Sequence, residues 1–269
     1  MNARDTDRAP ILAIEHASVI RDGHLLLDDV SWEIGPDERW ILFGANGSGK
    51  TTLMEVASSY LFPSRGTVHL FGHKLGKVDV RALRPRIGYV GPAPTALVRT
   101  TLSSLEIVIT GLHASFVDTR WHTYEDRDWD RAQECLAMLH AERLAERQFG
   151  TMSEGEKKRV LIARSLMGAP DLLLLDEPGS GLDLGARERL VDSLASLAES
   201  PEAPPVVLVT HHVEEIPPGF DHILMLAGGR VVTSGRLEDV LTAEALGDTF
   251  GLPLSIERRD RRWRAWMQT

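Results

Sequence analysis

The chain of 269 residues has few of the features that secreted and membrane-spanning proteins share. It contains one cysteine, Cys135, so it cannot form a disulfide within itself. Its first residues lack the apolar core of a signal peptide, and no apolar run approaches the ~18 residues that cross a bilayer. We therefore expect a cytoplasmic protein, which would need another chain to supply spanning helices if it works at a membrane.

Basic residues are also in the minority. The chain has 30 Lys and Arg against 39 Asp and Glu, which gives a formal net charge of -9. Surfaces that bind nucleic acid usually carry a clustered basic excess, so this balance argues against a nucleic-acid partner. With 43% hydrophobic and 26% charged residues the composition is ordinary for a folded protein, and length alone would allow one large domain or two small ones.

The most informative stretch is a glycine-rich loop between an apolar run at residues 40–43 and a helix-compatible run that starts at Thr52. The loop consists of Gly44, Ala45, Asn46, Gly47, Ser48, Gly49, Lys50 and Thr51. Glycines let backbone N–H groups wrap an anion, and the positive end of the following helix adds to the attraction. Lys50 would neutralise the β- and γ-phosphates, and the Thr51 hydroxyl would bind Mg2+. The loop therefore predicts a nucleoside triphosphate site, with a chance Gly/Ser turn as the alternative.

A pair of acidic residues follows a second apolar run. Residues 172–175 are four leucines, typical of a buried parallel strand, and Asp176 and Glu177 come directly after them. Asp176 could hold Mg2+ through water, while Glu177 could orient and deprotonate an attacking water. The alternative is a solvated charge pair at a turn, because Asp and the following Pro178 favour turns.

Strands and helices alternate along most of the chain. Short apolar runs predict strands at residues 11–14, 25–27, 30–34, 67–71, 87–90, 172–175, 206–209, 223–226, 230–233 and 262–266. Helical spacing predicts an inserted helical subdomain at about residues 92–168 and a helix at 184–198. This alternation predicts an α/β fold with a mostly parallel sheet. We expect a flexible tail at 1–10 and a single domain over 11–269, which ends in a hairpin, helix and strand extension at about 223–269.

Three more motifs complete the pattern. Residues 152–156 (MSEGE) precede a helical run, although Ser153 with Glu156 would also form an ordinary capping box. Residues 181–183 (GLD) follow the acidic pair, and His211 ends the next predicted strand. In this order the motifs closely resemble the ATP-binding cassette (ABC) ATPase family, and the resemblance covers nearly the whole chain.

The resemblance implies a P-loop NTPase fold with an N-terminal antiparallel β subdomain and an inserted helical subdomain. It implies ATP and Mg2+ as cofactors. Residues 44–51 match the Walker A loop, which binds the nucleotide together with Thr52, and in which Lys50 is catalytic and Thr51 binds the metal. Asp176 matches the Walker B aspartate, the second metal ligand, and Glu177 matches the catalytic base.

The same resemblance divides the site between two subunits. Residues 152–156 match the ABC signature, whose Ser153 and Gly155 contact the γ-phosphate bound by an opposing subunit. Asp183 matches an aspartate at the dimer interface, and His211 matches the switch histidine that senses or stabilises the γ-phosphate. A second copy of the chain, or a homologous ATPase subunit, is therefore an implied partner.

Three features depart from the family pattern. The family usually has a glutamine after its Tyr-Val strand, which contacts Mg2+ and links the site to the transmembrane partner, whereas here Gly91 and Pro92 follow and no glutamine lies nearby. Glu154 and Glu156 stand for the usual glycine and glutamine of the signature, and we expect both to face away from the triphosphate because carboxylates would repel it. The aromatic residue that commonly stacks on adenine is missing, and Arg21 lies near that position.

The leading hypothesis is the ATP-hydrolysing subunit of a transporter, which sits at the inner face of the cell membrane through a separate integral-membrane permease. Residues 228–242 are similar to import-type ATPases, and among these the chain most resembles the molybdate and the metal-chelate or cobalamin groups. One alternative is a soluble ABC ATPase outside transport, which the single cassette and the acidic balance disfavour. Another is a slow, nucleotide-gated regulatory module, motivated by the missing glutamine.

The last predicted strand interleaves arginines with tryptophans. In residues 258–266, five arginines surround Trp263 and Trp266 and could touch anionic lipid headgroups. The alternative is a solvated strand face anchored by tryptophan on its other side, which the interrupting Glu257 and Asp260 favour.

Overall fold

A computed structural model of the chain describes residues 9–91, 98–113 and 122–268. Its centre is a six-stranded sheet with the strand order β10-β9-β3-β8-β7-β6. These strands are β3 (Arg39–Gly44), β6 (Ile87–Val90), β7 (Leu172–Asp176), β8 (Val206–Thr210), β9 (His222–Ala227) and β10 (Arg230–Arg236). All neighbours from β9 to β6 are parallel, and β10 pairs antiparallel with β9. The predicted α/β fold with a mostly parallel sheet is confirmed.

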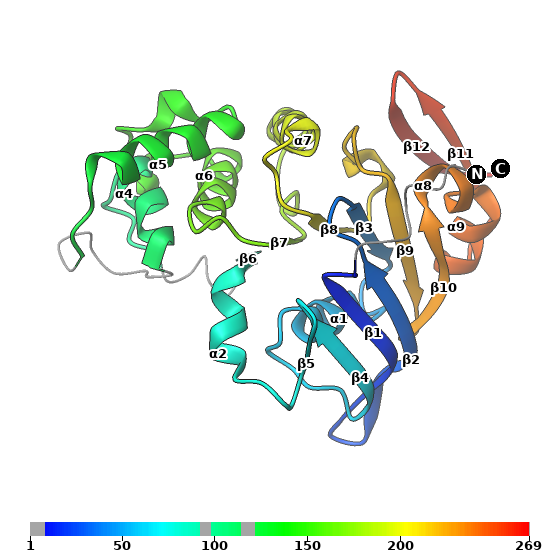
Figure 1. The fold of residues 1–269 in the computed structure, drawn as a ribbon. Helices are drawn as coiled ribbons and strands as arrows, with labels where there is room; N and C mark the ends of the chain where they lie inside the picture. The colour runs from blue at the N-terminus through cyan, green and yellow to red at the C-terminus, as the bar shows by residue number, and fades with distance from the viewer. Residues whose placement is uncertain (1–8, 92–97, 114–121, 269) are drawn as a thin grey trace.

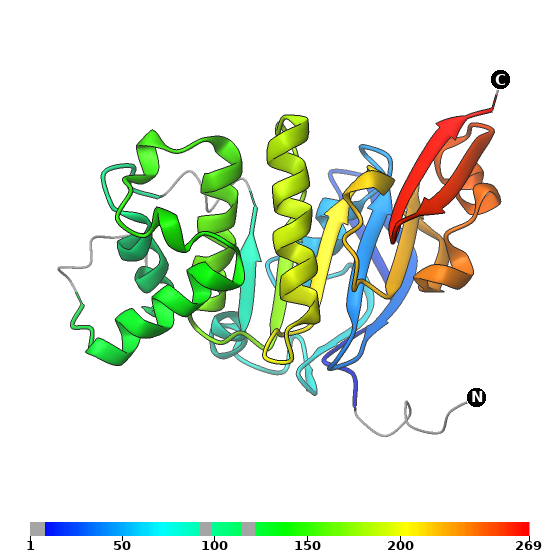
Figure 2. The ribbon, with the colours of Figure 1, turned by 90° about the horizontal axis from the view of Figure 1, so that it is seen from above.

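Helices pack against this sheet, and further helices lie beyond one of its edges. They are α1 (Lys50–Ala57), α2 (Val80–Leu83), α4 (Ser104–Ile109), α5 (Asp126–Met138), α6 (Glu154–Leu166), α7 (Leu184–Glu199), α8 (Leu237–Val240) and α9 (Ala243–Phe250). Short 3-10 turns are η1 (Arg84–Arg86), η2 (Thr110–His113), η4 (Glu142–Leu144), η5 (Phe149–Thr151) and η6 (Val213–Glu215). Figure 1 shows α4, α5 and α6 together as a lobe beyond β6, and Figure 2 shows α7 lying along the sheet. This lobe falls within the predicted insert at 92–168.

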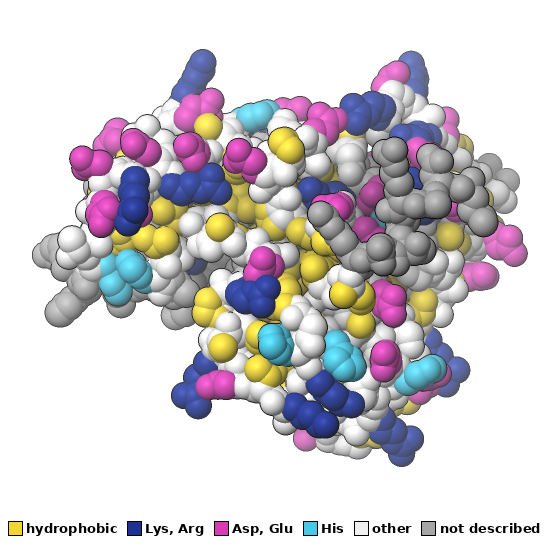
Figure 3. All heavy atoms as spheres, in the orientation of Figure 1, with side chains coloured by type: hydrophobic (Ala, Val, Ile, Leu, Met, Phe, Trp, Pro, Cys, Tyr) yellow, Lys and Arg dark blue, Asp and Glu magenta, His cyan; other side chains and the backbone are white. Residues whose placement is uncertain are grey.

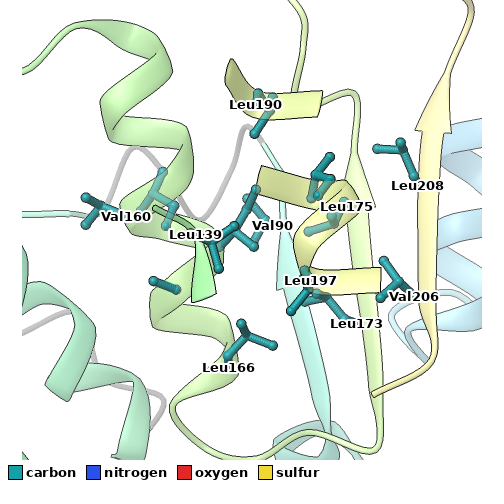
Figure 4. Packing of buried hydrophobic residues seen from close by; sticks show 14 of the residues in the cluster. Val90, Leu139, Val160, Leu166, Leu173, Leu175, Leu190, Leu197, Val206 and Leu208 are labelled. Carbon is teal, nitrogen blue, oxygen red and sulfur yellow. The ribbon is translucent and has the colours of Figure 1, made fainter. Parts of the chain in front are cut away.

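The core sheet is buried on both faces, which is why β7 and β8 are unbroken apolar runs. Neighbouring residues of β7 enter different cores. Leu173 and Leu175 pack on the side of α7, as Figure 4 shows with Leu190, whereas Leu172 and Leu174 pack on the side of α1. The sheet thereby fixes the loops at its carboxyl end between two packed layers.

A second, antiparallel sheet lies beside the α1 face. Its order is β2-β1-β4-β5, with β1 (Leu12–Arg21), β2 (His24–Ile34), β4 (Arg65–Leu70) and β5 (His73–Lys74). The sequence predicted two strands, at 25–27 and 30–34, where the structure has the single strand β2. The left-handed Asp29, with a φ of 56°, breaks the apolar alternation there, and the β1–β2 register shifts between Ala17 and Val19.

The chain ends in a hairpin of β11 (Leu254–Arg259) and β12 (Arg262–Met267). The sequence predicted a strand at 262–266 but missed β11, whose turn at Asp260 and Arg261 uses positive φ values of 50° and 64° without a glycine. Three arginines of the hairpin form ion pairs with residues outside it: Arg258 with Glu238, Arg261 with Glu199 at 2.8 Å, and Arg262 with Glu188 at 2.7 Å. Trp263 packs against the core. These contacts favour the anchored strand face over the lipid-binding interpretation.

Two expectations touch parts of the chain that are not described. The predicted tail at 1–10 falls mostly on residues 1–8, and the predicted insert includes residues 92–97 and 114–121, all outside the described residues. Among the helices that are described, none is both long enough and apolar enough to cross a membrane.

Candidate functional site

The glycine-rich loop connects the central strand β3 to α1, as its flanking sequence predicted. Gly49 precedes α1 with a φ of 105°, and a Cβ at this position would lie 2.9 Å from Leu27 Cδ2 and 3.0 Å from the Leu26 carbonyl oxygen. Only glycine fits both the dihedral angle and this close approach. The turn between β9 and β10 supports the loop, because the Gly229 N–H donates to the Ser48 carbonyl at 3.0 Å.

The loop borders a cleft of about 900 Å³ at the carboxyl end of the sheet. The cleft brings together the predicted site residues Asn46, Gly47, Gly49, Lys50, Thr51, Thr52, Asp176 and Glu177. Gly44, Ala45 and Ser48 belong to the same loop but do not line the cleft. Its size suits a drug-sized or nucleotide-sized ligand.

Lys50 is buried at the floor of this cleft, with 5% of its surface exposed. Its Nζ donates to the carbonyl oxygens of Gly44 at 2.8 Å and Ala45 at 3.0 Å, and lies 3.5 Å from Glu177 Oε1. The ammonium group therefore points to the place where the loop N–H groups would hold phosphates. A triphosphate would offer it stronger, charge-assisted acceptors than these carbonyls.

Asp176 ends β7 and is 8% exposed. Burial raises its pKa, and the Glu177 carboxylate adds to this, while the hydrogen bond from Tyr89 and the Lys50 charge act in the opposite direction. A cation beside it would relieve the cost of burying its charge. Within the described parts of the chain, no group of three or more His, Cys, Asp or Glu could hold a metal alone. Thr51 and Asp176 both line the cleft and could be the protein ligands of a Mg2+ held otherwise by substrate phosphates and water.

Glu177 has a left-handed backbone, with a φ of 45°, which is costly for a residue with a side chain. This turn directs its carboxylate between two cationic or polar partners. Its Oε1 lies 3.5 Å from Lys50 Nζ and 3.3 Å from His211 Nδ1. His211 rather than the adjacent His212 meets Glu177, and the two imidazole centroids are 4.1 Å apart.

A buried hydrogen-bond network lies behind His211. The Thr210 hydroxyl donates to Glu215 Oε2 at 2.5 Å, and the His212 N–H donates to Thr210 Oγ1 at 3.1 Å. Glu215 is 8% exposed, and a Cβ at Gly179 would lie 2.6 Å from its Oε1. Glu215 thus packs between the segment that carries His211 and the loop that follows Glu177.

Ser153 and Gly155 do not line the cleft of their own chain. Ser153 caps α6: its Oγ accepts from the Glu156 N–H at 3.4 Å and its own N–H donates to Glu156 Oε2 at 2.8 Å, so the capping box is present. Glu156 also pairs with Arg147 at 2.8 Å, and Glu154 pairs with Lys157 at 2.8 Å. Both carboxylates are therefore engaged within the lobe rather than directed at the cleft.

The structure adds cleft residues that the sequence did not indicate. Tyr89 and Lys158 reach the cleft from β6 and α6, and Leu25 and Leu26 line it beside the turn of β9 and β10. Arg21, suggested as an adenine-stacking residue, is exposed and does not line the cleft. Glu55, Ser180, Gly228 and Gly229 complete the lining. Lys158 lies two residues beyond the motif at 152–156, and the leucines lie on β2 away from any motif, so only the three-dimensional packing identifies them.

Comparisons with known proteins agree with this geometry. The family model described as ABC transporter matches residues 27–180. The chain is 40% identical over 247 residues to an uncharacterized ABC transporter ATP-binding protein, YlmA, of Bacillus subtilis (strain 168), which covers 91% of this chain and 93% of that protein. It is 33% identical over 254 residues to the hemin import ATP-binding protein HmuV of Rhodococcus jostii (strain RHA1), covering 92% and 82%.

A solved structure gives a similar result. The dimeric structure of a post-hydrolysis state of the ATP-binding cassette MJ0796, bound to ADP and Pi, is 25% identical and has a TM-score of 0.69. The match covers 84% of this chain and 98% of that chain.

Proposed function

The chain belongs to the ABC transporter family and is an ATP-hydrolysing, ATP-binding protein, and we propose that it works as a dimer that drives a separate membrane permease. The observation that supports this most directly is that Lys50, Asp176 and Glu177 line one cleft, while His211, outside the cleft lining, contacts Glu177 at 3.3 Å. A solvated charge pair or a chance turn would not bring residues from three separate segments together in this way.

Within one subunit, we assign the general-base role to Glu177. Its carboxylate would accept a proton as the water oxygen bonds to the γ-phosphorus and the bond to the β–γ bridging oxygen breaks, which yields ADP and inorganic phosphate. Lys50 and the backbone of residues 44–52 would hold the phosphates. His211, 3.3 Å from Glu177, would orient that carboxylate and contact the γ-phosphate. A Mg2+ held by Thr51 and Asp176 would neutralise charge on the phosphates.

The second subunit would complete the site. Ser153 and Gly155 lie outside the cleft of their own chain, so an opposing copy is needed if they contact the γ-phosphate. A relative that is dimeric with ADP and Pi supports this arrangement. The partner would be a second copy of the chain or a homologous ATPase subunit.

The permease would place the protein at the inner face of the membrane. Relatives with names such as hemin import ATP-binding protein support an import role. Purification with a co-encoded membrane protein would test this. Full activity in a cell whose gene neighbourhood encodes no permease, with no membrane association, would instead favour a soluble ABC ATPase.

The ATPase assignment is tested with Glu177→Gln, which keeps the size of the side chain but removes the base. We expect phosphate release to fall by roughly 10² to 10⁴. We also expect this variant to form dimers with ATP but not with ADP in size-exclusion chromatography, because the γ-phosphate would persist between the subunits. Equally negligible rates in the wild-type protein and the variant, with the permease present, would favour the regulatory-module alternative.

A further inference from the structure

Among the described residues that line the nucleotide cleft, Tyr89 is the one aromatic side chain. It lies on β6, next to β7 in the parallel sheet, and its Cα pairs with that of Leu174. Its hydroxyl donates to Asp176 Oδ2 at 3.3 Å. A phenolic hydroxyl is protonated at neutral pH, so it serves as a donor to the carboxylate.

Gly91 makes room for this tyrosine. A Cβ at residue 91 would lie 2.7 Å from the Tyr89 hydroxyl oxygen and 2.9 Å from both Cε1 and Cζ of its ring. Real Cβ atoms do not approach other atoms this closely. Any side chain at residue 91 would therefore displace the Tyr89 hydroxyl from its position beside Asp176.

The outer side of the Tyr89 ring is also packed. The Tyr60 ring centroid lies 6.4 Å from that of Tyr89, and the Arg84 guanidinium lies 4.5 Å from the Tyr60 centroid. The ring thus lies between the exposed Tyr60, which stacks with the partly buried Arg84, and the backbone at Gly91. A hydroxyl on a side chain with so little freedom can fix the orientation of the carboxylate that accepts its hydrogen bond.

We propose that Tyr89 is a positioning residue for the metal, which holds the Asp176 carboxylate by Oδ2 so that its other oxygen faces the Mg2+ and phosphates, and that Gly91 is required for this contact. The proposal rests on the assignment of Mg2+ to Asp176. In this role Tyr89 acts through Asp176 and is not itself a metal ligand. Its hydrogen bond restricts the rotation of the Asp176 carboxylate before the Mg2+–ATP complex binds, so less rotational freedom is lost on binding.

The test compares the dissociation constant of a fluorescent ATP analogue in Mg2+ and in EDTA. Tyr89→Phe removes only the hydroxyl, and we expect it to weaken binding in Mg2+ by roughly three- to tenfold while binding in EDTA stays within about twofold. Gly91→Ala keeps the hydroxyl but displaces it, so it should show the same Mg2+-specific loss. Because both changes break one contact, the double variant should be no weaker than the weaker single variant.

Matched controls separate this role from general packing. Tyr60→Phe removes a hydroxyl from the adjacent, exposed ring, and Gly168→Ala adds a methyl group where the nearest atom would be 3.8 Å away. Both should bind like the wild-type protein, and thermal melts without nucleotide would show whether each variant folds. Tyr89→Phe alone suffices if Gly91→Ala does not fold.

The outcomes distinguish the two assignments. If the wild-type protein binds the analogue equally well in Mg2+ and EDTA, the Mg2+ assignment at Asp176 fails. If wild-type binding depends on Mg2+ but Tyr89→Phe behaves like Tyr60→Phe, or weakens binding equally in both buffers, the role of Tyr89 is overturned and the metal assignment stands.

Discussion

Glu215 is a single residue on which two catalytic segments depend. Its carboxylate accepts a 2.5 Å hydrogen bond from Thr210, the residue before His211. It also fills the space beside Gly179, two residues after Glu177. Glu215 therefore connects the chain segments that carry the base and the switch histidine, although it lies outside the cleft lining.

Replacing Glu215 with alanine should damage both stability and turnover. The buried Thr210 hydroxyl would lose its acceptor, which costs about 1–3 kcal/mol. The looser contact between Glu177 and His211 should also lower phosphate release. Urea unfolding and a phosphate assay would measure the two effects, with Glu214→Ala, at a less buried neighbour, expected within about 0.5 kcal/mol of wild type. Indistinguishable stabilities of the two variants would contradict this role for Glu215.

At the scale of residues, the sequence predicts those parts of the site whose residues are close together in the chain. The loop at 44–51 and the acidic pair at 176–177 are contiguous, so their residue types alone indicate phosphate and metal chemistry. Tyr89 reaches Asp176 across 87 residues of chain, and its position depends on strand pairing and on the space at Gly91. The sequence shows that Gly91 stands where the family usually has a glutamine. It does not show that the Tyr89 side chain occupies the space next to Gly91.

Helices α4 and α6 offer a comparison at the scale of elements. Both begin with a serine and a capping box, Ser103 with Glu106 and Ser153 with Glu156. The two helices are capped in the same way, because each serine oxygen accepts a hydrogen bond from the backbone N–H of the third helical residue. Only Ser153 is also proposed to reach the γ-phosphate in an opposing subunit.

Alanine at each serine should therefore separate capping from the dimer role. Ser103→Ala and Ser153→Ala should each destabilise the fold by about 1 kcal/mol in chemical unfolding. In the Glu177→Gln background, only Ser153→Ala should reduce the ATP-dependent dimer in size-exclusion chromatography. Equal dimer fractions in both would mean that Ser153 does no more than cap α6.

Elements were predictable where apolar periodicity was unbroken, as in β7, β8 and α7. The exceptions were strands whose regularity is interrupted or weak. Asp29 divides β2 in the sequence, and β11 places only Leu254 and Ile256 against the core. Both strands are completed by pairing with a neighbouring strand, which the local sequence does not encode.

The molecule as a whole is held together by two hydrophobic cores that share the central sheet. Residues at the sheet ends can therefore influence the stability of the entire fold. On the face in Figure 3, acidic and basic side chains are interspersed on the surface. Because ion pairs at the surface are exposed to solvent, each adds little to the stability of the fold. A partly buried charged pair at the start of β9 is a stronger candidate for a global effect.

His222 begins β9, stacks on Trp40 with centroids 4.9 Å apart, and lies 2.9 Å from Asp221. Burial lowers the pKa of His222, but the hydrogen bond and charge of Asp221, with Glu38, outweigh it and raise the pKa above the usual 6.5. Asp221 also accepts from the Arg39 N–H at 2.9 Å, which joins β9 to the start of β3. Protonated His222 thus stabilises the shared sheet.

Because the pKa of His222 is raised on folding, its contribution is complete below about pH 6.5 and is lost as the pH rises through the folded-state pKa. Wild type should therefore lose more stability between pH 6 and pH 8.5 than His222→Gln in chemical unfolding. His16→Gln is the matched control, because His16 also lies 2.8 Å from an aspartate, Asp29, but its side chain is 78% exposed. We expect this control to keep the wild-type pH dependence, and a parallel profile for His222→Gln would mean that the pair at β9 does not govern global stability.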